Sequence, residues 1–82
     1  MPGKAMIELP EMTPPLKRSV TIERHRTSVS LEEAFWQELG RIASNHNETR
    51  ATLIARIDRT RPPEVGLATA LRLFVLADLQ RG

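Results

Sequence analysis

The sequence predicts a small, mainly α-helical domain that begins with one short β-strand. Along residues 26–31 the side chains alternate with the period of a strand. One side carries Arg26, Ser28 and Ser30, and the other carries Thr27, Val29 and Leu31. From Phe35 onward, apolar residues recur at helical spacing instead. Because an isolated strand with unpaired edges needs a partner, we expect a second copy of the chain to complete the fold.

The first 16 residues are predicted to be a flexible, proline-rich arm. Four of the six prolines fall there, and proline disfavours both helices and central strands. The segment RSVTI, residues 18–22, alternates like a strand but is short. We therefore expect the folded domain to span residues 17–82.

Three helices are predicted, over residues 32–45, 50–60 and 67–79. The first has an apolar stripe and ends at the Asn-His-Asn cluster 45–47, since Asn tolerates the left-handed conformation that closes helices. Thr49 is the expected N-cap of the second helix, and the proline pair 62–63 ends it. The third is apolar nearly all round, so we expect it to be buried on more than one side.

These patterns predict a core that two chains share. A domain of 82 residues buries only about 60 to 65% of the surface that its unfolded chain exposes, so pairing with a second copy would enlarge a marginal core. Trp36 is expected to lie in the core or in the dimer interface. The predicted dimer core consists of the apolar strand and helix positions Val29, Leu31, Phe35, Trp36, Leu39, Ile42, Leu53, Ile54 and Ile57.

Composition argues against several functional classes. The chain has no cysteine, hence no disulfide and no thiolate metal site, and its two histidines lack the companions of a catalytic or metal centre. We expect neither an enzyme nor a cofactor nor a metal. No apolar run is long enough to span a membrane and none resembles a signal peptide, so we expect a cytoplasmic protein without a membrane partner.

Charge is clustered rather than high. The net charge is only +2, but residues 17–26 hold four cations against one acid. A second basic series, Arg50, Arg56, Arg59 and Arg61, has Asp58 as its one acid. Clusters of this kind suggest a polyanion partner, although a solvated charged face is the commoner explanation.

A strand with this outer face suits DNA. A two-stranded antiparallel ribbon fits the major groove, where Arg26 can grip guanine O6 and N7 and serine hydroxyls can donate or accept. We therefore predict base contacts from Arg26, Ser28 and Ser30. Arg26 can equally be a surface charge, and Ser30 with Glu33 also fits a capping box, S-x-x-E, in which Ser30 would only cap the first helix.

The start of the second helix is a predicted phosphate site. Free backbone N–H groups and the helix dipole attract anions there, beside Thr49 and Arg50, although Thr49 can also act as a cap alone. Lys17, Arg18 and Arg24 are expected to add auxiliary basic contacts.

The chain also resembles a known family. The run RTSVSLEEAFWQELGRIA, with RSVTI, HRTSVSLE, FW, IARID and ALRLFVL, is similar to ribbon-helix-helix DNA-binding proteins of the Arc and methionine repressor superfamily, and to a small bacterial subfamily within it. The resemblance covers roughly residues 17–79. It implies an intertwined homodimer with a two-stranded antiparallel ribbon between the subunits, base contacts from that ribbon and phosphate contacts from the second helix. Residues 18–22 and the third helix lie outside the minimal fold and would brace the dimer or build a higher oligomer.

The resemblance implies a dimeric transcriptional regulator that binds double-stranded DNA. The alternative is an antitoxin-like or adaptor module that uses the same dimer with weak or no specific DNA binding. Such a module would dock a protein partner on the third helix or on the N-terminal arm. The operator, the regulated genes and any effector cannot be read from the residues.

Overall fold

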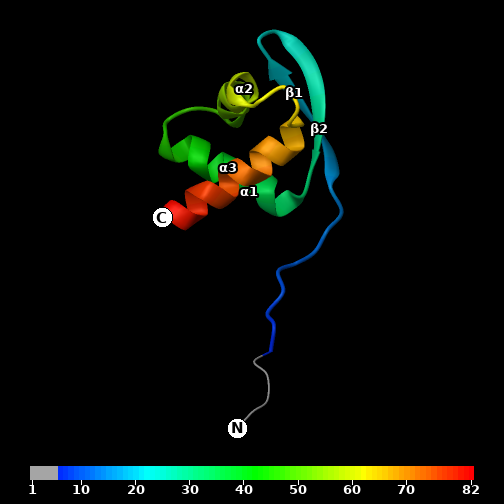
Figure 1. Cartoon of the computed structure of the whole chain (residues 1–82), viewed down its shortest axis with the longest axis vertical. Coiled ribbons are helices and arrows are strands. Elements are labelled where there is room, and N and C mark those ends of the chain that lie inside the picture. The colour runs from blue at the N-terminus through cyan, green and yellow to red at the C-terminus, as the bar shows by residue number, and fades with distance from the viewer. Residues whose placement is uncertain (1–5) are drawn as a thin grey trace.

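A computed structural model describes residues 6–82, and the first five residues of the predicted arm lie outside this range. A two-stranded hairpin is followed by three helices (Figure 1): β1 Leu16–Ile22, β2 His25–Leu31, α1 Glu33–Asn45, α2 Arg50–Thr60 and α3 Leu67–Arg81. Residues 6–15 contain no helix or strand, and they lead away from the folded part of the chain. The predicted fold class, mainly α with a short antiparallel ribbon and an added C-terminal helix, is confirmed.

The ribbon is a hairpin within one chain. Strand β1, which covers the strand-like RSVTI segment, pairs antiparallel with β2 so that Leu16 faces Leu31 and Ile22 faces His25. Two residues join the strands, Glu23 with φ 51° and Arg24 with φ 70°. Positive φ at both central positions is the mark of a type I′ turn, whose twist matches that of the flanking strands.

This arrangement differs from the one that we predicted for the strand 26–31. We expected its partner to be the same strand of a second subunit, whereas β1 of the same chain fills one of its edges. The physical reason is local, because a two-residue turn costs far less chain entropy to close than an encounter between two molecules. The structure contains one chain, so pairing of β2 with a second copy stays a prediction.

The helices cover one face of the hairpin (Figure 1). Strand alternation turns Val20, Ile22, Val29 and Leu31 towards them, and all four are buried. Of the nine residues in the predicted shared core, six are already buried within one chain: Val29, Leu31, Leu39, Ile42, Leu53 and Ile54. Phe35, Trp36 and Ile57 are partly buried and pack against that core, which Leu71 and Val75 of α3 complete. A single chain therefore buries most of what we expected two chains to share.

The structure of the helix ends decides whether Ser30 caps the first helix. The hydroxyl of Thr49 accepts a hydrogen bond from the Thr52 backbone N–H at 3.1 Å, which is the N-cap expected for α2. At the end of α1, Asn47 has φ 57°, the left-handed conformation expected of that cluster. The N-cap of α1, however, is Glu32, without a side-chain capping bond. The capping-box interpretation of Ser30 is therefore wrong, because Ser30 is still in β2.

Candidate functional site

The outer face of the hairpin is polar, exposed and free of acid. Six side chains point away from the helices, three from each strand, and the register sets them in directly opposed pairs. The pairs are Lys17 with Ser30, Ser19 with Ser28, and Thr21 with Arg26. We call these six residues the outer face. It contains two cations and four hydroxyls.

Sequence reasoning found only part of this face. Arg26, Ser28, Ser30 and Lys17 were expected to meet a ligand, and all four are exposed. Ser19 and Thr21 were missed, because residues 18–22 had no assigned partner. The signal was present in the alternation of Ser19 and Thr21 with the apolar Val20 and Ile22.

Arg18, expected as an auxiliary basic residue, points the other way. Its side chain is only 13% exposed and donates to the backbone oxygen of Leu31 and, at 2.9 Å, to the carboxylate of Glu33. Its guanidinium also lies over the Trp36 ring, 5.1 Å from the ring centroid. Arg18 thus joins β1 to the end of β2 and the first turn of α1.

A second arginine also lies over the Trp36 ring. The Arg50 guanidinium lies 4.5 Å from the Trp36 centroid, and its Nε donates to the Trp36 backbone oxygen at 3.0 Å. Arginine over an aromatic ring is attracted to the negative face of the ring. Gly40 leaves the space for this approach, because a Cβ there would come within 2.9 Å of the Arg50 Cζ. The hairpin base is therefore linked to the start of α2 through an Arg18–Trp36–Arg50 stack.

Acids at the start of α1 support this link. Hydrogen bonds from Arg18 and then from Gln37 hold the pKa of Glu33 below its ordinary value. A two-bond contact from Arg72 of α3, at 2.9 and 3.2 Å, likewise lowers the pKa of Glu32. Both carboxylates are therefore ionised at neutral pH and bound to arginines, so neither is available to repel an anion at the hairpin.

At the N-terminus of α2 the predicted phosphate residues lie together. Thr49 is exposed and caps the helix, while Arg50 is half-buried by its contact with Trp36. A polar hollow lies beside them, between α1 and the start of α2. Glu48, which lines this hollow, forms an ion pair with Arg56 at 2.7 Å. That pairing neutralises the charge most able to weaken anion binding.

The remaining cations separate into two sets. Within residues 6–82, seven arginines lie within ion-pair distance of a carboxylate: Arg18, Arg41, Arg56, Arg59, Arg61, Arg72 and Arg81. Over the same residues, the cations without a carboxylate partner are Lys17, Arg24, Arg26 and Arg50. Three of these four are on the hairpin and the fourth is at the start of α2. Among residues 6–82, the cations outside ion-pair distance of a carboxylate thus lie on the hairpin and at the start of α2, the two places that the sequence predicted for DNA contact.

A comparison with protein families agrees with this geometry. The family model described as a ribbon-helix-helix domain matches residues 15–79, which is most of the chain. The chain belongs to the ribbon-helix-helix domain family. This family typically binds DNA, as transcription regulators or as antitoxins, and its fold is a DNA-binding one rather than an enzymatic one. Searches of curated proteins and of solved structures found no match.

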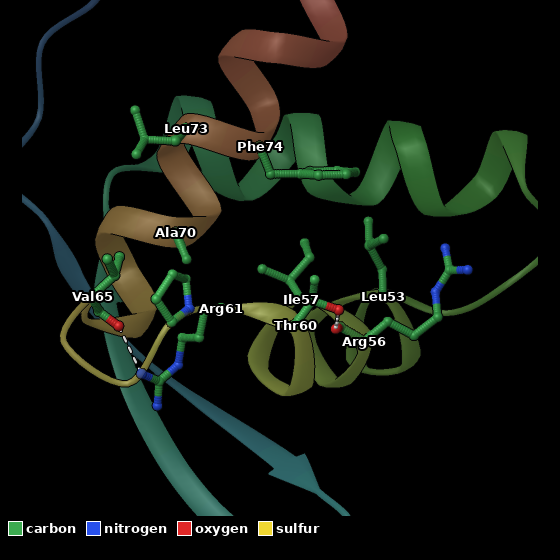
Figure 2. A pocket seen from close by; sticks show the side chains of 10 residues that line it. Leu53, Arg56, Ile57, Thr60, Arg61, Val65, Ala70, Leu73 and Phe74 are labelled. Carbon is green, nitrogen blue, oxygen red and sulfur yellow. Dashed lines mark hydrogen bonds between the residues drawn. The ribbon is translucent and has the colours of Figure 1, made fainter.

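This ribbon-helix-helix chain also carries an apolar groove between α2 and α3 (Figure 2). The groove has a volume of about 640 Å³, and its walls include Leu53, Ile57, Val65, Leu73 and Phe74. In the close-up, Phe74 of α3 lies over Ile57 and Leu53 of α2, whereas Leu73 projects to the other side of α3. The Leu73 residue is 57% exposed. Leu76 and Leu79, further along α3, are exposed to a similar degree. The third helix, predicted to be buried on more than one side, keeps an uncovered apolar side.

Two kinds of feature are absent from residues 6–82. Among the described residues, no group of three or more His, Asp or Glu side chains is placed to hold a metal ion. Over the same range, no helix is both long and apolar enough to cross a membrane.

Proposed function

We propose that this protein is a transcriptional regulator that places the outer face of its hairpin in the major groove of double-stranded DNA. The observation that carries the proposal is the separation of the cations. Lys17, Arg24, Arg26 and Arg50 have no carboxylate partner within the described chain, whereas seven arginines do. A two-stranded ribbon fits a groove about 12 Å wide, and its cations displace the counterions of the phosphates.

Base reading is assigned to three residues of β2. Arg26 has the planar, two-donor geometry that matches guanine O6 and N7. Ser28 and Ser30 can donate to or accept from any base edge, and their short side chains let the strand approach closely. Support comes from their shared outward direction and from the loss of the capping role for Ser30.

Phosphate contacts are assigned to the start of α2. Thr49 is exposed there, and the helix dipole and first backbone N–H groups favour an anion. Arg50 is held close by Trp36, so it contributes charge from a fixed position rather than from a mobile side chain. The pairing of Glu48 with Arg56 removes the nearest opposing charge.

The regulator is proposed to act as a homodimer. Support comes from the family, whose members usually form dimers, and from the exposed apolar side of α3. Sedimentation at micromolar concentration tests this directly, with a dimer expected. A folded monomer at that concentration would contradict it.

Binding is tested first by its dependence on salt. The proposed phosphate contact Arg50, with the two hairpin cations that read no base, Lys17 and Arg24, predicts a log–log slope of about −2.7 for each chain bound, since each neutralised phosphate contributes about −0.9. A flat dependence, or no binding of folded protein at low salt, would remove the regulator proposal.

Specificity is tested with Arg26→Ala against Arg81→Ala. Both remove one exposed arginine, but Arg81 is at the end of α3, away from the hairpin. A base contact predicts a loss of about 1–3 kcal/mol at the preferred sequence for Arg26→Ala alone. Equal effects of the two variants would mean that Arg26 contributes only charge.

The second candidate is an antitoxin-like or adaptor module, and the apolar groove favours it. A helical segment with apolar residues at helical spacing would suit a groove lined by Leu73 and Phe74. This candidate replaces the first if folded protein fails to bind DNA while Leu73→Asp, at an exposed position, abolishes self-association or partner binding.

A further inference from the structure

We propose that the N-terminal segment 6–12 of one copy binds in the apolar groove between α2 and α3 of a second copy. The segment, MIELPEM, carries large apolar side chains that are mostly exposed, and the groove is an uncovered apolar surface of the same protein. This contact is independent of DNA, and it is separate from the strand pairing expected between two copies.

The prolines of the N-terminal segment favour one extended conformation. Pro10, Pro14 and Pro15 each fix φ at about −65°, and residues 6–15 form neither helix nor strand. Both features suit the polyproline II helix, which has three residues per turn and a rise of about 3.1 Å per residue. Side chains three residues apart therefore lie on the same edge of the segment.

This period gives the segment an apolar edge and an acidic edge. The apolar edge consists of Met6, Leu9 and Met12, which are 91%, 67% and 69% exposed. The acidic edge consists of Glu8 and Glu11, about 9 Å apart in this conformation. Among residues 6–82, neither glutamate is within ion-pair distance of a cation. Contiguous exposed apolar side chains of this kind commonly mark an interaction site.

The groove between α2 and α3 offers the complementary features. Phe74 of α3 lies over Ile57 of α2, so aromatic and aliphatic side chains face each other across it (Figure 2). Grooves with aromatic walls are a common binding site for polyproline II segments. Arg56 in α2 and Arg61 at its C-cap also line the groove. Five residues of helix separate them by about 7.5 Å along the axis, close to the spacing of the two acids.

Both arginines keep donors for a carboxylate of another chain. Arg56 bonds Glu48 through Nη2, and its side chain is 53% exposed. Arg61 bonds Asp58 through Nε and the Val65 backbone oxygen through Nη1. Because a guanidinium has five N–H donors, each arginine can bind a second acid without leaving the first. The acidic edge therefore meets cations where the apolar edge meets carbon.

The proline pair before β1 indicates that the groove belongs to a second copy. To enter the groove of its own chain, the segment would have to reverse direction between Met12 and Leu16, the first residue of β1. The residues available for that reversal are Thr13, Pro14 and Pro15, and consecutive prolines hold a chain extended. The segment also leads away from the folded part of its own chain (Figure 1).

Docking is tested by paramagnetic broadening between full-length chains. One preparation carries a nitroxide on Ile7→Cys, which lies off the apolar edge in a chain without other cysteines. The other carries isotope-labelled methyl groups and no nitroxide. The two are mixed in urea and refolded together, so that each assembly can contain both. The strongest broadening is expected at the methyl groups of Ile57 and Val65 in the groove. No broadening, or strongest broadening elsewhere, would overturn the proposal.

Two variants of the spin-labelled chain separate a specific contact from nonspecific association. Leu9→Asp places a charge on the apolar edge and should abolish the broadening. Thr13→Asp adds the same charge on another edge and should retain it. Both residues are exposed and precede β1, so both variants should fold, which circular dichroism checks. Equal broadening with the two variants would show that the apolar edge makes no contact. Equal loss would show an effect of charge alone, and either result would refute the proposal.

Discussion

The effect of Gly40→Ala on the stability of the fold is expected to change sign when Arg50 is replaced, because the Arg50 side chain lies against Gly40. Replacing glycine by alanine inside an exposed helix normally stabilises it by about 1 kcal/mol, because alanine loses less backbone entropy on folding. Gly40 is in the middle of α1, so that gain applies. A Cβ at this position, however, would lie 2.9 Å from Arg50 Cζ and 3.3 Å from Nε, too close for the guanidinium to stay over Trp36.

The displaced guanidinium loses two interactions. Its stacking on Trp36 is worth about 0.5–1 kcal/mol for a partly exposed pair. The hydrogen bond from Nε to the Trp36 backbone oxygen, 3.0 Å long, is worth about 1.5 kcal/mol because its donor is charged. The combined loss of about 2 kcal/mol exceeds the helical gain of about 1 kcal/mol. Gly40→Ala should therefore destabilise the protein by about 1 kcal/mol, a fall in Tm of about 4–8 °C.

In a chain that already carries Arg50→Ala, the same change has nothing to displace. There Gly40→Ala should stabilise the fold by about 1 kcal/mol. The four proteins of this double-mutant cycle are compared by urea unfolding at one protein concentration, followed by circular dichroism and by the fluorescence of Trp36, the one tryptophan in the sequence. Equal stabilisation by Gly40→Ala in both backgrounds would refute the coupling through Arg50.

Three further predictions concern the hairpin and its base. Leu31→Asp should unfold the protein, since it buries a charge at a fully buried position, whereas Leu16→Asp at the opposed, 47% exposed position should be tolerated; circular dichroism distinguishes them. The lowered pKa of Glu33 adds stability that is present above about pH 4.5 and is lost as pH falls through the lower folded-state pKa, so Glu33→Gln should flatten the decline in acid unfolding curves. Replacing the turn residues by Glu23→Asn and Arg24→Gly should raise the unfolding free energy by about 1 kcal/mol, and an unchanged or lower value would contradict a strained left-handed turn.

The helices were predictable because their signals are local. Helix α2 covers Arg50–Thr60, between a threonine that caps it and a proline pair that cannot continue it. Helix α1 ends where Asn47 adopts a positive φ. The inner and outer sides of β2 also followed from alternation, with Val29 and Leu31 buried and Arg26 exposed, although Thr27, predicted to lie on the inner side with them, is exposed.

The segment RSVTI was predicted to be strand-like, but its pairing with β2 was not predicted, because the turn between the two strands lacks the usual residues. Hairpins with two-residue loops favour Asn-Gly or Asp-Gly, whose residues accept positive φ at little cost. Here Glu23 and Arg24 both adopt positive φ, at a cost of about 1–2 kcal/mol each. The burial of Val20 and Ile22 against the helices offsets that strain. Such burial depends on the tertiary structure, so the local sequence of the turn does not reveal it.

The basic series around α2 shows why counting charge along the sequence misjudged the surface. Residues 50–61 hold four arginines and one acid, which suggested a polyanion site. In the folded chain, Arg56 pairs with Glu48 across eight residues and Arg59 with Glu23 across 36, while Arg61 takes Asp58. Exposed pairs of this kind add little stability, but each removes a cation from the field that a polyanion meets. The fold therefore determines which cations stay unpaired. The outward cations of the hairpin have no acid on their face, because every residue opposite them carries a hydroxyl. An acid introduced there, as in Ser28→Asp, should therefore weaken binding to all DNA sequences more than the loss of any arginine of α2.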